Sequence, residues 1–168
     1  MQSKRTTLRR IEHSDLEDIH VLESDVSIMR FTSLGAAQSK EQTERRLQEH
    51  LARQAELEPF GRWVAHSKED RSFVGWFMLL RGKKEDELEL GYMLSKAHWG
   101  KGLATEIGNE LVNFVRSKAE IAKIVATTNT DNLGSIRVLE KIGFAYIGTI
   151  EEHASTGGEP LRNFELIL

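Results

Sequence analysis

Two glycines flank a lysine at Gly100-Lys101-Gly102, between an expected strand that ends near Leu94 and an expected helix that begins near Leu103. A helix start leaves several backbone N–H groups without an acceptor, and the helix dipole adds partial positive charge there. The glycines let the backbone approach a bulky anion, and Lys101 would add a charge. The segment predicts a phosphate or pyrophosphate site, although glycine also occurs in strand-to-helix turns that bind nothing.

The residues around this turn exclude several familiar phosphate and metal sites. The sequence has neither the GxxxxGK[ST] pattern of a Walker loop nor the GxGxxG pattern of a dinucleotide-binding turn. The six histidines show no HxxxH or HExxH spacing, so no metal site is expected. The absence of cysteine excludes disulfides, thiolate metal ligands and an acyl-cysteine intermediate.

Two carboxylates lie two residues apart in the strand expected before this turn, at 87–94. Because side chains alternate between the two faces of a strand, Glu87 and Glu89 point together to the face opposite the leucines. A carboxylate there could accept a proton from a reacting group. The alternative interpretation is a solvent-exposed strand face.

The hydrophobic pattern predicts an α/β (α+β) fold with one domain over residues 1–168. Strands are expected at 6–11, 62–66, 72–80, 87–94, 121–127, 144–150 and 162–168, and helices after Ser14 and at 39–57, 103–118 and 132–142. This order implies a mixed, mostly antiparallel sheet of about seven strands with helices on both faces. Trp63, Trp76 and Phe77 are expected in the core, or else in the wall of a substrate pocket.

The amino-acid composition and net charge limit the classes of function that the chain can have. The 168 residues are 39% hydrophobic and 29% charged, as is typical of a globular protein. A formal net charge of -3 argues against nucleic-acid binding and mildly suits a cationic partner. No apolar run follows the basic N-terminal residues and no stretch has transmembrane length, so we expect a cytoplasmic protein that does not bind membranes.

Two segments give the glycine turn a more specific meaning: ELGYMLSKAHWGKGLATE at 89–106 and NLGSIRVLEKIGF at 132–144. In this order they closely resemble the GNAT acetyltransferase superfamily, and within it the ribosomal-protein-alanine N-acetyltransferases and their relatives. The resemblance covers nearly the whole chain. It implies acetyl-CoA as co-substrate, with its pyrophosphate bound by Trp99, Gly100, Lys101, Gly102, Leu103, Ala104 and Thr105. The superfamily usually has Gln or Arg at the position of Trp99.

The same resemblance implies where the thioester lies. Asn132 and Ser135 match an N-x-x-S element near the pantetheine arm and the thioester sulfur, although Asn132 is also a natural helix N-cap. Many members of the superfamily place a tyrosine in this motif to protonate the departing thiolate. Leu139 has that position here, so Ser135 is predicted to act instead.

Residues of the strand at 87–94 complete the implied site. Glu89, with Glu87 as the alternative, would deprotonate the acceptor amine. A backbone amide near Met93, Leu94 or Ser95 would polarise the thioester carbonyl.

The implied activity is direct transfer of an acetyl group from acetyl-CoA to a primary amine in a ternary complex. The predicted acceptor is a protein or peptide N-terminus, and a small amine such as a polyamine, an aminoglycoside or an amino-acid derivative is the alternative. A non-catalytic CoA-binding module is the third possibility, because Leu139 replaces the usual tyrosine. The early helices and the segment 151–160 should wall the acceptor site, in a monomer or a homodimer.

Overall fold

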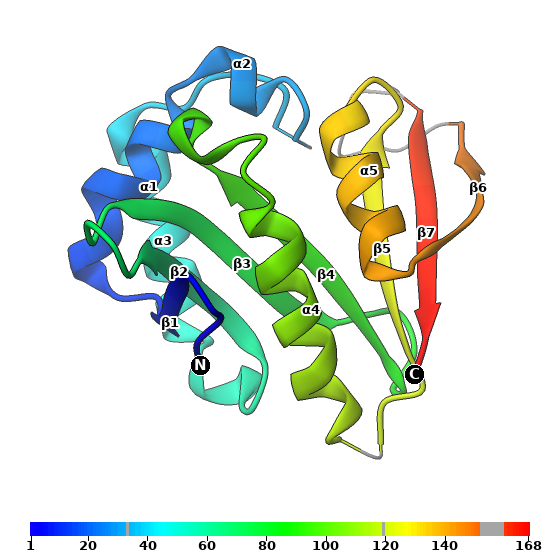
Figure 1. The fold of residues 1–168 in the computed structure, drawn as a ribbon. Coiled ribbons are helices and arrows are strands. Elements are labelled where there is room, and N and C mark those ends of the chain that lie inside the picture. The colour runs from blue at the N-terminus through cyan, green and yellow to red at the C-terminus, as the bar shows by residue number, and fades with distance from the viewer. Residues whose placement is uncertain (33, 119, 152–159) are drawn as a thin grey trace.

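A seven-stranded sheet runs through the computed structural model of the chain, which describes residues 1–32, 34–118, 120–151 and 160–168 (Figure 1). The strands are β1 (Thr6–Arg10), β2 (Gly61–Ser67), β3 (Phe73–Arg81), β4 (Glu87–Leu94), β5 (Lys123–Asn129), β6 (Ala145–Ile150) and β7 (Leu161–Ile167), in the sheet order β1-β2-β3-β4-β5-β7-β6. β4 and β5 pair in parallel, and the other described neighbours pair antiparallel. The predicted α/β class and mixed seven-stranded sheet are confirmed.

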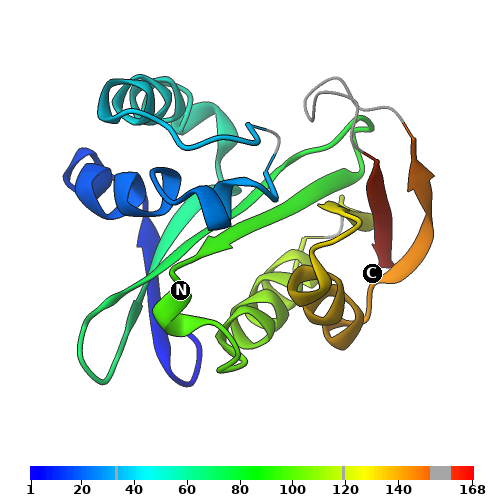
Figure 2. The same cartoon turned by 90° about the horizontal axis from the view of Figure 1, so that it is seen from above.

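Helices cover both faces of this sheet (Figures 1 and 2). One face carries α4 (Leu103–Arg116) and α5 (Leu133–Ile142), and the other carries α1 (Leu16–Glu23), α2 (Val26–Met29) and α3 (Lys40–Ala52). Short 3-10 turns lie at His13–Asp15, Ala55–Leu57 and Lys96–His98. The sequence did not predict α2, which begins after Asp25, whose carboxylate accepts a hydrogen bond from the Ser27 N–H at 2.9 Å.

The third helix is shorter than predicted. Ser39 caps its start as expected, but the helix ends at Ala52 rather than near residue 57. The residues after Ala52 bring no large apolar side chain to the face that carries Leu47 and Leu51, and packing of such a face is what holds a helix in place.

The main core lies between the sheet and the α4–α5 pair. The alternation predicted for β4 is present, because Leu88, Leu90 and Leu94 all pack into this core. α4 and α5 contribute Ile107, Leu111, Val115, Ile136, Leu139 and Ile142. This packing fixes the starts of both helices against the ends of β4 and β5.

Candidate functional site

The parallel pairing of β4 with β5 stops early. Glu87, Leu88 and Glu89 pair with β5, whereas β3 and β4 stay paired as far as Leu94. The second half of β4 therefore has an open edge toward β5. Two cavities meet at this opening, and both are lined by Phe31, Thr32, Tyr92, Met93, Asn132 and Ser135.

The first cavity, of about 600 Å³, lies beside the loop that links β4 to α4. Of the residues that the sequence assigns to CoA, it is lined by Met93, Leu94, Trp99, Gly100, Gly102, Leu103, Ala104, Thr105, Asn132 and Ser135. Lys101 is not among the lining residues, and its carbonyl oxygen accepts a hydrogen bond from Arg5 Nη1 at 3.0 Å. We call this the donor cavity.

Positive charge at the donor cavity comes from α5. Arg137 and Lys141 line it, and neither was predicted from the sequence as a site residue. They are four residues apart in the helix of the second motif, so they lie on one helix face. The four-residue spacing of two basic residues in this helix could have indicated from the sequence that both contribute to an anion site.

The backbone at the start of α4 has a conformation that favours glycine. Gly100 has a φ of 70° and Gly102, the N-cap of α4, has a φ of 75°. A Cβ at Gly100 would have no neighbour within 4 Å, so the turn rather than crowding explains the glycine. The first N–H groups of α4 lack acceptors within the helix and belong to residues that line the donor cavity. This arrangement suits a pyrophosphate.

Asn132 and Ser135 lie where the two cavities meet. The Oδ1 atom of Asn132 accepts a hydrogen bond from the Ser135 N–H at 3.1 Å, so the expected helix cap is present. The same two residues also line both cavities, so capping and a place in the site occur together. Leu139 is 1% exposed and packs in the core.

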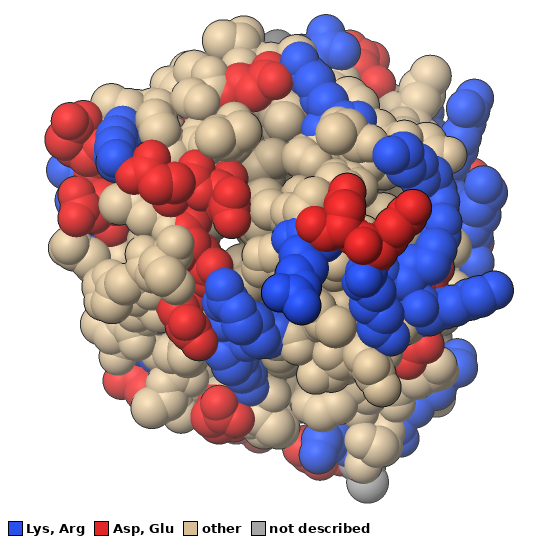
Figure 3. Space-filling view, turned by 60° about the vertical axis from the view of Figure 1, so that its left-hand side comes forward, with Lys and Arg blue, Asp and Glu red and all other residues tan. Residues whose placement is uncertain are grey.

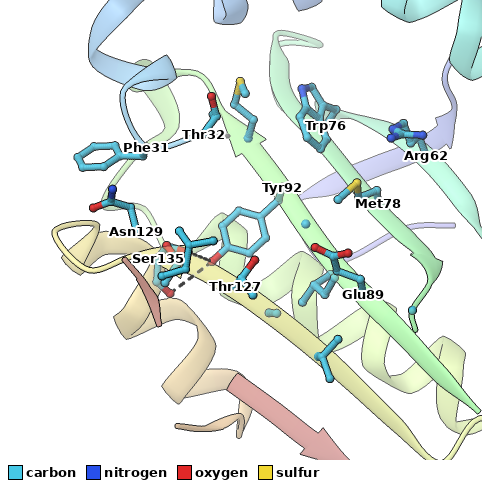
Figure 4. Close-up of a pocket in the computed structure, with 18 of the residues that line it drawn as sticks. Phe31, Thr32, Arg62, Trp76, Met78, Glu89, Tyr92, Thr127, Asn129 and Ser135 are labelled. Atoms are coloured by element: carbon cyan, nitrogen blue, oxygen red, sulfur yellow. Dashed lines mark hydrogen bonds between the residues drawn. The ribbon is translucent and has the colours of Figure 1, made fainter. Parts of the chain in front are cut away.

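Tyr92 reaches the same point from β4 and was not predicted as a site residue. Its Oη lies 2.9 Å from the Ser135 Oγ, and it also donates to the Ser135 carbonyl oxygen at 3.4 Å (Figure 4). Its ring stacks on Phe77, with centroids 5.7 Å apart. Burial raises the pKa of Tyr92 to about 12, against a lowering by the Ser135 hydrogen bond. The phenol is therefore protonated at neutral pH.

The second cavity, of about 840 Å³, lies on the sheet face that α1 and α3 cover. Arg62 is opposite Met78, and Met78 is opposite Gly91. Directly opposed residues point to the same face, so these positions share a face with Trp76 and Glu89 (Figure 4). We call this the acceptor cavity.

The three aromatic residues that the sequence places in the core or in a pocket wall differ in their surroundings. Trp76 forms part of the wall of the acceptor cavity. Trp63 and Phe77, at 5% and 0% exposure, belong to the main core, as the sequence favoured.

The two candidate bases have different surroundings. Glu87 is buried, its Oε2 lies 3.2 Å from the Nζ of Lys123, and its Oε1 accepts a hydrogen bond from the Lys83 N–H at 3.1 Å. Glu89 lines the acceptor cavity without a hydrogen-bond or ion-pair partner among the residues that the structure describes. Glu89 is therefore better placed to take up a proton.

The open edge of β4 presents a backbone donor. The Ser95 N–H donates to the Val74 carbonyl oxygen at 3.0 Å, toward β3. Because successive backbone groups of a strand point to opposite edges, the Leu94 N–H points toward the opening. Trp99 Nε1 donates to the Leu94 carbonyl oxygen at 2.8 Å and fixes this turn of the chain.

The wall that the sequence predicts for the acceptor site is described in part. Phe31 and Thr32, which follow α2, line both cavities, but residues 152–159 of the expected wall lie outside the described residues. Among the described residues, no group of three or more His, Cys, Asp and Glu side chains could hold a metal ion. No helix within the same ranges is long and apolar enough to cross a membrane.

Comparison with known proteins agrees with this geometry. Residues 5–145 match the acetyltransferase (GNAT) domain family. The uncharacterized N-acetyltransferase YoaA of Bacillus subtilis is 28% identical over 162 residues, covering 95% of this chain and 90% of that protein.

Two solved structures share the fold at low sequence identity. A spermidine N-acetyltransferase from Vibrio cholerae, in complex with CoA and spermine, has a TM-score of 0.81 at 20% identity, covering 97% of this chain and 95% of its own. The ribosomal L7/L12 alpha-N-protein acetyltransferase RimL, in complex with CoA, has a TM-score of 0.83 at 16% identity, covering 99% and 96%.

Proposed function

The chain belongs to the GNAT family of acetyl-CoA-dependent N-acetyltransferases, and from that premise we propose that its acceptor is the α-amino group of a peptide or protein N-terminus. Transfer to an amine is supported by the meeting of the donor and acceptor cavities at the open edge of β4. A thioester held there is open to an amine that approaches from the other cavity. Holding both reactants in contact supplies much of the rate in such a transfer. The choice of an α-amine is supported by the charges in the acceptor cavity, where the two carboxylates other than Glu89, those of Glu23 and Glu87, are each paired with a cation.

We propose that Glu89 accepts the proton of the attacking ammonium group, directly or through one water molecule. The freed amine attacks the thioester carbon, and the Leu94 N–H stabilises the negative charge that develops on the carbonyl oxygen. The bond between carbon and sulfur then breaks. The electron pair leaves with sulfur, and a proton from the hydroxyl pair of Ser135 and Tyr92 converts the thiolate to free CoA. The new amide nitrogen gives up its second proton to water, and a proton returned through water restores the hydroxyl pair.

The charges in the acceptor cavity favour an α-amine over a polyamine. Of the carboxylates that line it, Glu23 is paired with Arg46, and Glu87 with Lys123. Glu89 is the one without such a partner among the described residues. A single free carboxylate suits one ammonium group, whereas a polyamine carries several. An α-amine with a pKa near 7.8 needs only about 1.1 kcal/mol for deprotonation at pH 7, against about 4.6 for a lysine-like amine.

A thiol-release assay with acetyl-CoA tests this proposal. The chain has no cysteine, so a thiol reagent reports only the CoA that the reaction releases. Short peptides with a free α-amine and one internal lysine are compared with spermidine and with an aminoglycoside, and mass spectrometry locates the acetyl group. Acetylation of the α-amine supports the proposal. Turnover of the polyamine alone, or CoA binding without turnover of any acceptor, would overturn it.

A further inference from the structure

Basic side chains from two elements gather at the end of the acceptor cavity that lies away from the open edge of β4. Arg62 belongs to β2, and Arg46 and His50 belong to α3, and all three line the cavity. In the close-up, Arg62 lies beyond Met78 as seen from Glu89 (Figure 4). This end of the cavity is made by residues that the mechanism does not use.

The charge of Arg46 is already matched. Its Nη2 pairs with the buried carboxylate of Glu23, and its Nη1 donates to the Gln38 Oε1 at 2.9 Å. Glu23 also accepts a hydrogen bond from the Thr43 hydroxyl at 2.7 Å. Arg46 is thus held in a closed network.

Arg62 differs from Arg46 in this respect. It is partly buried, and its guanidinium has no hydrogen-bond or ion-pair partner within the part of the chain that the structure describes. Burial, with a smaller contribution from Arg53, lowers the pKa of Arg62 to about 10, against an opposing effect of Glu89. A guanidinium removed from water without a partner is costly, and a carboxylate or phosphate can satisfy it with two parallel hydrogen bonds.

His50 reports the same positive potential. Burial, together with the nearby charges of Arg62, Arg46 and Arg53, lowers its pKa to about 4. His50 is therefore uncharged at neutral pH and can donate or accept a hydrogen bond beside Arg62.

The face that Figure 3 shows carries both acidic and basic side chains, which lie next to one another near its middle, with Lys and Arg more numerous toward its right-hand side. The Arg62 guanidinium, by contrast, lines the acceptor cavity.

The strand register sets the reach of a ligand that touches both ends. Arg62 and Glu89 lie in strands separated by β3, and neighbouring strands are about 4.8 Å apart, so their backbones are on the order of 10 Å apart. An extended peptide advances about 3.3 Å per residue. An anion that meets Arg62 while the amine lies near Glu89 is therefore several bonds from that amine.

We propose that Arg62, with His50 beside it, binds an anionic group of the acceptor, a carboxylate or a phosphate carried several bonds from the amine that is acetylated. This inference rests on the proposed function and narrows it. The favoured acceptor is a peptide whose second or third residue is acidic.

Matched peptides test the inference. Ala-Asp-Ala-Ala and Ala-Ala-Asp-Ala amides are compared with the same peptides containing Asn, which differ only in charge. For the wild-type protein, kcat/KM is expected to be about tenfold higher for the better Asp peptide, as a hydrogen-bonded charge typically provides. An ω-amino carboxylate of similar length serves as the small-molecule source of the same anion.

Variants of Arg62 separate binding of the anion from a general loss. Arg62→Gln should remove the preference for Asp by raising KM for the Asp peptide, with the Asn peptide changed by less than about twofold, because the charge-assisted hydrogen bonds are lost. Arg62→Lys should keep part of the preference, and it also serves if the Gln variant does not fold. Arg45→Gln, on the exposed side of α3, removes one charge as the matched control and should change neither peptide.

Three outcomes separate this inference from the proposed function. Equal kcat/KM for Asp and Asn peptides in the wild type overturns the anion site and leaves the peptide acceptor standing. A preference for the ω-amino carboxylate over every peptide supports the anion site and overturns the peptide acceptor. If no acceptor is turned over, calorimetry measures the binding of the Asp and Asn peptides to the protein–CoA complex. Tighter binding of the Asp peptide that is lost in Arg62→Gln supports the inference. Equal binding of the two peptides, or a preference that Arg62→Gln keeps, overturns it.

Discussion

The hydroxyl of Tyr92 lies 2.9 Å from the hydroxyl of Ser135, across the gap between β4 and α5. The stack on Phe77 and the cap from Asn132 hold the two ends of this contact in place. Both residues line both cavities. The structure thus brings a phenol from β4 to the point where the two cavities meet, whereas Leu139, at which the resemblance predicts a tyrosine in many relatives, packs in the core.

Tyr92→Phe tests whether this phenol delivers the proton to the thiolate. We expect kcat to fall about 10²-fold, the range of general acid catalysis, with KM for acetyl-CoA nearly unchanged. Because burial holds the pKa of Tyr92 at about 12, the wild-type rate should show no loss of this acid between pH 6 and 9. Steady-state kinetics by thiol release measure both.

Tyr146→Phe is the matched control. The hydroxyl of Tyr146 contacts Thr149 at 2.7 Å on β6, and its side chain is exposed. A similar fall in kcat for this variant would show that loss of a phenol acts through stability rather than through the site.

Ser135→Ala and Tyr92→Phe should not be additive. If the two hydroxyls pass one proton, either single change breaks the path, and the double variant should be little worse than the worse single variant. A double-mutant cycle in kcat, at saturating acetyl-CoA, gives the coupling. If the fold-loss in kcat of the double variant equals the product of the two single fold-losses, the two hydroxyls do not share one role.

Local features of this site were predictable and contacts between distant segments were not. The glycine turn before α4 and the cap by Asn132 depend on a few neighbouring residues, so the sequence indicated both. Tyr92 and Ser135 are 43 residues apart, and their contact depends on how far β5 diverges from β4.

The position of Arg62 in the acceptor cavity was likewise not predictable from the sequence. The strand pattern placed the two glutamates of β4 on one face, but a place for Arg62 on that face requires the register of β2 against β3. The sheet, its class and the helices other than α2 followed from periodicity, because each of these helices and strands carries that signal within itself.

Gly102→Ala tests the start of α4 as the pyrophosphate site. A side chain in the left-handed conformation costs about 1–2 kcal/mol, and relief of that strain would rotate the first N–H groups of the helix away from the cavity. KM for acetyl-CoA should rise about tenfold while kcat changes little. Gly143→Ala, at the left-handed C-cap of α5, is the strained control and should lower stability without this change in KM. Unchanged binding of CoA by Gly102→Ala in calorimetry contradicts the assignment.

Glu89→Gln and Glu87→Gln should separate catalysis from stability. Loss of a general base at position 89 should lower kcat/KM about 10²-fold, and more for amines of high pKa, which depend more on a base. Glu87→Gln should instead lower the free energy of unfolding, because Glu165, at 3.4 Å, is then the one carboxylate that Lys123 keeps among the residues that the structure describes. Rate measurements with amines of graded pKa, together with urea unfolding, distinguish them. The reverse pattern would assign the base to Glu87.

His50 should make the free energy of unfolding decrease in mild acid. Its folded-state pKa of about 4 lies below the ordinary 6.5, chiefly because of burial and then because of Arg62. Between these two values the unfolded chain binds more protons than the folded chain, so the contribution is complete above pH 6.5 and is lost as pH falls toward 4. With allowance for partial exposure, the loss should be about 1 kcal/mol. Urea unfolding from pH 7 to pH 4 should show a shallower decline for His50→Gln than for the wild type or for His13→Gln at an exposed site. Equal slopes for all three proteins would mean that His50 is no less basic in the folded protein than in the unfolded chain.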